Sequence, residues 1–172
     1  MLHRITQFIW ALTSSFKKVD YKYVSRYLTD DEKHLFNNMK KSDMQHCIRV
    51  AKNIEYSLGN KEYNIKYDDQ KINELIRLGL LHDIGKSECK LNCIEKSIMV
   101  ILNKLTKSKI KKFTKFKIVR NYYNHADRGA NLLSQLNNQY TDQFIEAIKN
   151  HHNKGTIKNE ELLILKRADD IS

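Results

Sequence analysis

The chain of 172 residues contains no proline and only five glycines. It also contains no internal repeat and no Gly/Ser-rich linker, so nothing in its composition divides it into several domains. Its length allows one domain with a substantial core that needs no disulfide or metal staple. Leu, Ile, Lys, Glu and Asn are abundant, and the apolar residues recur at helical rather than alternating intervals. The sequence therefore predicts an all-α domain.

Long apolar runs are also missing. Residues 8–12 (Phe-Ile-Trp-Ala-Leu) are too few for the core of a signal peptide and far too few to span a bilayer. The three cysteines, Cys47, Cys89 and Cys93, are an odd number. Without a secretory signal they predict reduced thiols and a cytoplasmic protein. Cys89 and Cys93 have no second Cys/His pair at matching spacing, so two ordinary thiols are favoured over a zinc site.

Acidic residues are fewer than basic ones, and the formal net charge is +11. Such a charge suits nucleotides, nucleic acid or acidic lipid, although solvated helix surfaces also explain much of it. Residues 104–120 hold seven lysines and Arg120, with Phe113 and Phe116 among them. This lysine run could bind a polyphosphate or single-stranded nucleic acid. The alternative is a solvated helix surface whose two phenylalanines pack inward.

The apolar spacing predicts a series of helices. Thr29 and the acids after it indicate a helix start within residues 1–41, which read as two or three short helices. An amphipathic helix over 43–58 ends at Gly59-Asn60. A helix over 69–84 is apolar almost all round and belongs at the centre of the domain. Further helices are expected at 94–105, 113–136, 142–152 and 159–171.

Five of the seven histidines lie on or beside these apolar stripes: His46, His82, His125, His151 and His152. Asp169 also shares a helix face with apolar residues, whereas His3 and His34 follow no pattern and are expected at the surface. A single inward histidine is usually a core residue with a satisfied hydrogen bond. Burying five imidazoles and two carboxylates together is costly unless they are paired or bind metal. Imidazole with carboxylate suits zinc, iron or manganese.

Residues 80–86 (Leu-Leu-His-Asp-Ile-Gly-Lys) resemble the central motif of the HD superfamily of metal-dependent phosphohydrolases. An upstream histidine, His46, and the downstream segments 125–130, 151–152 and 168–171 occur in the order of that family's other ligands. The resemblance covers residues 43–172. It implies an HD-domain helical bundle there and leaves residues 1–42 as an N-terminal helical extension.

The resemblance also implies a ligand set. The family's simplest members hold one metal with four ligands, which match His46, His82, Asp83 and Asp169. Two further histidines mark subgroups with two metals, and His125 and His151 match these. Asp83 would then bridge the metals, and His152 would be an additional ligand or face the substrate. Two divalent transition-metal ions are expected, iron or manganese, with zinc, nickel, cobalt or magnesium as alternatives.

The implied activity is hydrolysis of a nucleotide or a related phosphate ester or anhydride by a metal-activated water. Asp83 would be catalytic, and Lys86 and Arg128 would meet the developing negative charge. Asp127 or Asp170 could orient a water or a histidine that lies behind the ligands. The expected partner is a phosphorylated small molecule, with nucleic acid disfavoured, no membrane span, and a homodimer as a compatible assembly.

Subgroup features narrow the resemblance. The cyclic-di-GMP phosphodiesterases carry a Gly-Tyr-Pro element after a double histidine, whereas His151-His152 is followed here by a segment without proline. Ala147-Ile148 and Ala168-Asp169 resemble positions in the diadenosine-tetraphosphate hydrolases, which are the nearer subgroup. One alternative is a non-catalytic sensor that binds metal and nucleotide on the same fold. A basic nucleic-acid-binding protein is a further alternative, but it gives no reason for five inward histidines.

Overall fold

The computed structural model describes residues 18–59, 67–88, 95, 98–99, 101–102, 105–106, 109–136, 140–153, 155 and 158–172. These residues contain helices and no strand, which confirms the all-α prediction. The α-helices are α2 (Tyr21–Tyr27), α3 (Asp30–Asn37), α4 (Lys41–Gly59), α5 (Asp69–Leu81), α7 (Lys117–Tyr123), α8 (His125–Ser134), α9 (Asp142–Asn150) and α10 (Glu160–Asp170). Two short 3-10 helices are η1 (Ile84–Ser87) and η2 (Lys109–Lys112).

Polar side chains cap the starts of most of these helices. Thr29 accepts from the amide of Glu32, whose carboxylate accepts from the amide of Thr29, and this reciprocal pair forms a capping box at α3. Four other helices have a single capping residue whose side chain accepts from the amide three positions later. These residues are Asp20 at α2, Asp68 at α5, Thr141 at α9 and Asn159 at α10. The chain has no proline that could start a helix, so these polar caps mark where the capped helices begin.

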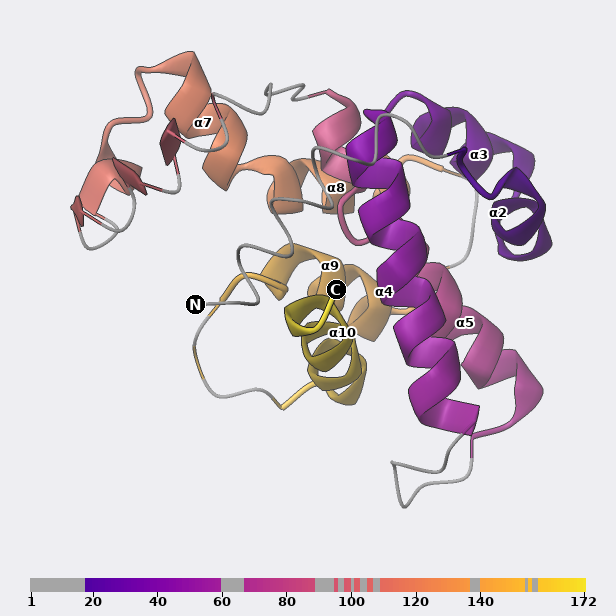
Figure 1. Cartoon of the computed structure of the whole chain (residues 1–172). Helices are drawn as coiled ribbons and strands as arrows, with labels where there is room; N and C mark the ends of the chain where they lie inside the picture. The colour runs from indigo at the N-terminus through magenta and orange to yellow at the C-terminus, as the bar shows by residue number, and fades with distance from the viewer. Residues whose placement is uncertain are drawn as a thin grey trace.

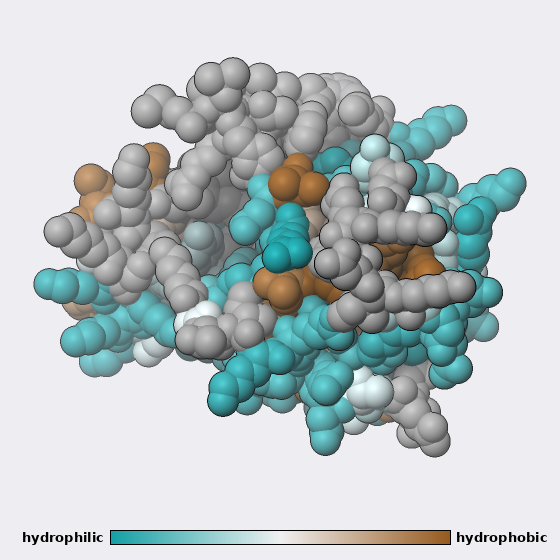
Figure 2. Space-filling view, turned by 90° about the horizontal axis from the view of Figure 1, so that it is seen from below, coloured by the Kyte–Doolittle hydropathy of each residue, from teal (hydrophilic) through white to brown (hydrophobic). Residues whose placement is uncertain are grey.

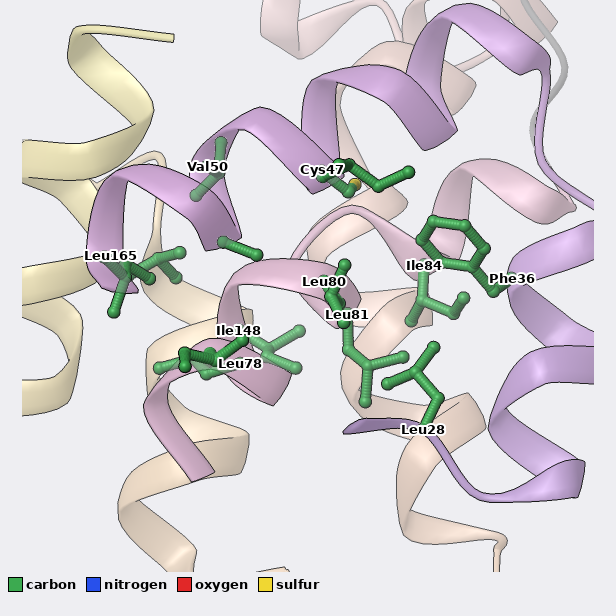
Figure 3. Packing of buried hydrophobic residues seen from close by; sticks show 14 of the residues in the cluster. Leu28, Phe36, Cys47, Val50, Leu78, Leu80, Leu81, Ile84, Ile148 and Leu165 are labelled. Carbon is green, nitrogen blue, oxygen red and sulfur yellow. The ribbon is translucent and has the colours of Figure 1, made fainter. Parts of the chain in front are cut away.

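Helices α4 and α5 form the centre of the domain, with α9 and α10 packed against them (Figure 1). The two helices approach closely at Gly79, where a Cβ would lie 2.9 Å from the Cα of Ala51. Leu78, Leu80 and Leu81 of α5 are fully buried. Leu78 lies beside Ile148 of α9, and Leu80 and Leu81 lie toward Ile84 (Figure 3). The sequence prediction that this helix is central is confirmed.

The described part of the N-terminal extension shares this core. Val24 of α2 and Phe36 of α3 are buried, and Phe36 lies beside Ile84 of η1 (Figure 3). Glu32 of α3 is also fully buried, where its carboxylate accepts from Arg77 of α5 at 2.6 Å. Helices α2 and α3 therefore stabilise the segment that carries the His-Asp pair.

Three of the predicted helices end early or break next to a histidine. Helix α5 ends at Leu81 and not at residue 84, and α9 ends at Asn150 and not at residue 152. The helix expected over 113–136 is two helices, α7 and α8, with a break at Asn124. Each of these breaks lies directly before a histidine of the predicted metal site.

Several predictions fall partly or wholly outside the described residues. Cys89, Cys93 and His3 are among them, as are many residues of the expected 94–105 helix. Cys47 is a buried free thiol and His34 is exposed. Within the described residues, no helix combines the length and the apolar character needed to cross a bilayer.

Candidate metal centre

His82 and Asp83 lie in a turn between α5 and η1. Successive residues of an α-helix point about 100° apart, so two neighbours in a continuous helix point in different directions. The chain avoids this by leaving the helix after Leu81, and Asp83 has φ −101° and ψ 12°. Both side chains are only 1% exposed. The second adjacent pair, His151 and His152, likewise lies in a turn directly after a helix, α9.

The rings of three histidines are held by carbonyl groups at the end of the preceding helix. The last four carbonyl groups of a helix have no partner within it. His82, His125 and His151 each donate Nδ1–H to such a carbonyl three residues earlier: Gly79 at 2.9 Å, Tyr122 at 2.8 Å and Ile148 at 2.6 Å. Because a carbonyl only accepts, Nδ1 must carry the proton, and the Nε2 lone pair faces the site. This orientation is the one that a metal ligand requires.

Asp83 lies between two groups of histidines. Its Oδ2 atom is 3.5 Å from His82 Nε2 and 3.8 Å from His46 Nε2. Its Oδ1 atom is 3.4 Å from His125 Nε2 and 3.7 Å from His151 Nε2. The two oxygens of one carboxylate therefore face different sets of ligand atoms.

The first group, on the Oδ2 side, combines three helical elements. His46 comes from α4, and His82 and Asp83 from the turn after α5; their ligand atoms lie within 4.8 Å of one another. Asp169 of α10 closes this side, with its Oδ1 3.0 Å from His46 Nε2 and 4.0 Å from His82 Nε2. Segments more than a hundred residues apart in the chain thus meet at one point.

The second group, on the Oδ1 side, contains Asp83, His125, His151 and His152, again with ligand atoms within 4.8 Å of one another. His125 Nε2 is 2.8 Å from His152 Nε2. His125 and His151 are buried, whereas His152 is exposed. The second group therefore has one side open to solvent.

Burial controls the protonation of this cluster. It lowers the pKa of His82 to about 4 and that of His125 to about 3, so both imidazoles are neutral near pH 7. Although His152 is exposed as a whole, the protein atoms packed around its ring desolvate it, and together with the nearby imidazoles of His151 and His125 this lowers the pKa of His152 to about 2. Burial would raise the pKa of Asp83, but the positive charge of Lys86 and the contact with His82 outweigh it and hold that pKa well below its ordinary value. Neutral imidazole and ionised carboxylate are the forms that bind metals.

The cluster leaves buried polar atoms without a partner. Among the described residues, Asp83 Oδ1 and His151 Nε2 are buried and make no hydrogen bond. They lie 3.7 Å apart, which is too far for a hydrogen bond between them. An unpaired buried acceptor beside an unpaired buried carboxylate oxygen is costly. A cation held between them would satisfy both, so the residues present fit a metal.

Lys86 lies within the cluster and not at its rim. Its Nζ pairs with Asp83 Oδ2. Burial would lower its pKa, but Asp83 and Asp43 outweigh burial and raise it. Asp43, in the first turn of α4, is buried and was not among the residues singled out from the sequence. An acid three residues before His46 is the signal that could have identified it.

The other polar residues predicted for the site lie at its margin. Arg128 is half-buried in the first turn of α8, three residues after His125. Asp127 and Asp170 are exposed. The hydrogen bonds that orient His82, His125 and His151 come from backbone carbonyls. The role of Asp127 or Asp170 in orienting a water or a histidine behind the ligands stays a prediction.

Gly85 sets the distance between the His-Asp turn and α8. A Cβ at this position would overlap the carbonyl oxygen of His125 and lie 2.6 Å from the amide nitrogen of Gly129. Such contacts are too short for any residue with a side chain. The absent side chain lets η1 press against the start of α8, which brings His125 to Asp83.

The comparisons with known proteins give one match. The family model described as HD domain matches residues 44–172. No curated protein and no solved structure matches the chain. The matched range contains all seven residues predicted to bind metal, and the structure brings these seven together. Their assignment as ligands remains a prediction.

Proposed function

The chain belongs to the HD domain family, whose members are generally metal-dependent hydrolases, and we propose that it is a phosphohydrolase with two divalent metals. The arrangement of Asp83 carries the proposal for two metals. Its two carboxylate oxygens face separate histidine groups, and Oδ1 is buried without a hydrogen-bond partner. A carboxylate in this position suits the bridging role that the sequence resemblance implies.

Each group offers enough ligands for one metal. The Oδ2 side would use His46, His82, Asp83 and Asp169, and the Oδ1 side would use Asp83, His125, His151 and His152. Iron or manganese suits this mixture of imidazole and carboxylate, and zinc, nickel, cobalt or magnesium are alternatives. When bound, such metals supply an activated water near neutral pH and offset charge on a phosphate.

The chain's own residues prepare the site for this chemistry. The carbonyls of Gly79, Tyr122 and Ile148 hold three imidazoles with Nε2 toward Asp83. Lys86 keeps Asp83 ionised and adds a positive charge beside the position that a phosphate would take. Arg128, one turn into α8, would add a second positive charge as the phosphate becomes more negative. The exposed position of His152 gives the substrate an approach from the Oδ1 side.

We extend the proposal to the substrate class. A nucleotide, or a related phosphate ester or anhydride, matches a site that combines two metals with Lys86 and Arg128. Ala147-Ile148 and Ala168-Asp169 favour a protein similar to the diadenosine-tetraphosphate hydrolases. A cytoplasmic location and a homodimer complete the proposal.

The test is an activity assay with controlled metal content. Metal-free protein, prepared with a chelator, should release no product from nucleoside triphosphates, dinucleoside polyphosphates, cyclic dinucleotides or simple phosphomonoesters. Adding Mn²⁺ or Fe²⁺ should restore hydrolysis of at least one phosphoanhydride or ester by about 1000-fold or more over the metal-free rate. Nucleotide binding to metal-loaded protein without product from any substrate would identify a sensor instead and reject the enzyme.

A further inference from the structure

The positive charge of this protein is concentrated in one segment. Residues 96–126 contain nine of the 31 Lys and Arg residues and none of the 20 Asp and Glu residues. This one segment therefore accounts for nine of the net +11. Six of these cations are described, and all six are exposed: Lys109, Lys111, Lys112, Lys115, Lys117 and Arg120.

The same segment exposes large apolar side chains. Among the described residues, eight large hydrophobic side chains are exposed, and five of them lie in this segment: Ile98 (44% exposed), Ile101 (57%), Leu105 (74%), Phe113 (56%) and Phe116 (61%). The alternative in which both phenylalanines pack inward is therefore wrong. We call residues 98–99, 101–102, 105–106 and 109–123 the basic arm.

The basic arm projects from the domain on the side of η2 and α7 (Figure 1). On the same side in the space-filling view, hydrophobic residues appear at the surface next to hydrophilic ones (Figure 2). Met99 and Val119 of the basic arm are buried. The exposed apolar residues of the arm lie outside the hydrophobic core cluster of the domain.

Exposed apolar side chains and exposed cations in one segment suit a partner that is both anionic and apolar. Single-stranded nucleic acid offers phosphates and base faces, which suit Phe113 and Phe116 but give no stacking role to aliphatic side chains. Ile98, Ile101 and Leu105 follow i, i+3, i+7 spacing and are aliphatic. The interface of a bilayer accepts aromatic and aliphatic residues alike, and its anionic headgroups attract the surrounding lysines.

We propose that the basic arm docks the protein on the surface of membranes that contain anionic lipids. The apolar side chains enter the boundary between headgroups and acyl chains, and the lysines pair with lipid phosphates and carboxylates. No helix needs to span the bilayer for this kind of association. The arm leads through α7 directly into α8, so docking brings the His/Asp cluster close to the membrane surface.

Sedimentation with lipid vesicles tests this proposal on the purified full chain. The protein should sediment with vesicles of phosphatidylcholine and phosphatidylserine at low salt, and should stay in solution with phosphatidylcholine alone. Binding should weaken as salt is raised, because the attraction between exposed charges is screened. Failure to bind phosphatidylserine vesicles at low salt would overturn the proposal.

Two sets of variants separate the contribution of the lysines to vesicle binding from that of the apolar side chains. Replacing Lys111, Lys112 and Lys115 together by glutamine should lower vesicle affinity by about 10- to 100-fold. The matched control replaces Lys18, Lys22 and Lys41, which are exposed outside the basic arm, and should stay within about three-fold of wild type. Equal losses in the two triple variants would mean that total charge, and not the arm, binds the vesicle.

Ile101→Ser with Leu105→Ser should also lower vesicle affinity by about ten-fold or more, whereas Tyr56→Ala, which removes an exposed aromatic of α4, should not. Thermal melting controls for folding.

Nucleic-acid binding is the competing outcome. It would leave the Ile101/Leu105 variant unaffected, and Phe113→Ala with Phe116→Ala would then weaken binding of a single-stranded oligonucleotide; that pattern would overturn membrane docking.

Discussion

Asp83→Asn is expected to remove both metals and to lower kcat/KM by at least about 1000-fold. The amide keeps the size of the side chain but has no negative charge and only one oxygen. It therefore cannot serve the histidine groups on both sides of the residue, which lie near different carboxylate oxygens. Metal content by elemental analysis and hydrolysis of the best substrate from the nucleotide assay measure the two effects.

The matched control for this substitution is Asp31→Asn. Asp31 is an exposed carboxylate in the first turn of α3 and lies outside the cluster. This variant should keep the metals and activity within about three-fold of wild type. Circular dichroism shows whether the Asp83 variant still folds, since Lys86 loses its partner there. A folded Asp83→Asn protein with both metals and full activity would exclude Asp83 as the bridging ligand.

Gly85→Ala is expected to lower the free energy of unfolding by about 2–4 kcal/mol and to weaken metal binding on the Oδ1 side of Asp83. The new methyl group would overlap the carbonyl of His125 and crowd the amide of Gly129. Both obstacles are backbone atoms, so η1 and α8 must separate. Urea denaturation and metal titration measure the two effects.

Gly59→Ala gives the opposite result and serves as the control. Gly59 is the last residue of α4, and a Cβ there would meet nothing within 4 Å. Alanine is the better helix former, so this variant should be unchanged or more stable by up to about 1 kcal/mol. Equal stability of the Gly85 and Gly59 variants would show that the contact between η1 and α8 does not control the position of His125.

The sequence predicts the helices and the membership of the cluster well, because both depend on local patterns. The apolar spacing of α4 and α5 gives two strongly patterned helices, and the capping residue Thr29 begins α3 where expected. The His-Asp pair, His125 and His151 lie beside apolar residues, so their burial follows from helical periodicity. His152, which the same periodicity predicts to face inward, is exposed. The sequence predicts Asp169 on the apolar face of its helix, and Asp169 of α10 contacts the cluster at His46.

The helix ends at the site were not predictable from these patterns. Apolar periodicity continues through His82, Asn124 and His151, whereas the chain leaves the helix at or beside each of them. The cause is tertiary. The carbonyls of Gly79, Tyr122 and Ile148 at the helix ends accept hydrogen bonds from the imidazoles. No local residue pattern predicts such a bond.

Other parts of the site depend on contacts between distant segments. The pairing of Lys86 with Asp83 and the support from Asp43 require α4 and η1 to be in place first. The exposure of Phe113 and Phe116 likewise depends on what packs against the basic arm. A helical pattern cannot determine either result, since it describes one element at a time.

The most direct test of the account is anomalous diffraction from crystals of the Mn²⁺-loaded protein. Two anomalous peaks are expected roughly 3.5–4 Å apart, one on each side of the Asp83 carboxylate. One peak should contact His46, His82 and Asp169, and the other His125, His151 and His152. A single peak bound by only one group, or peaks away from Asp83, would contradict a two-metal centre built on this residue.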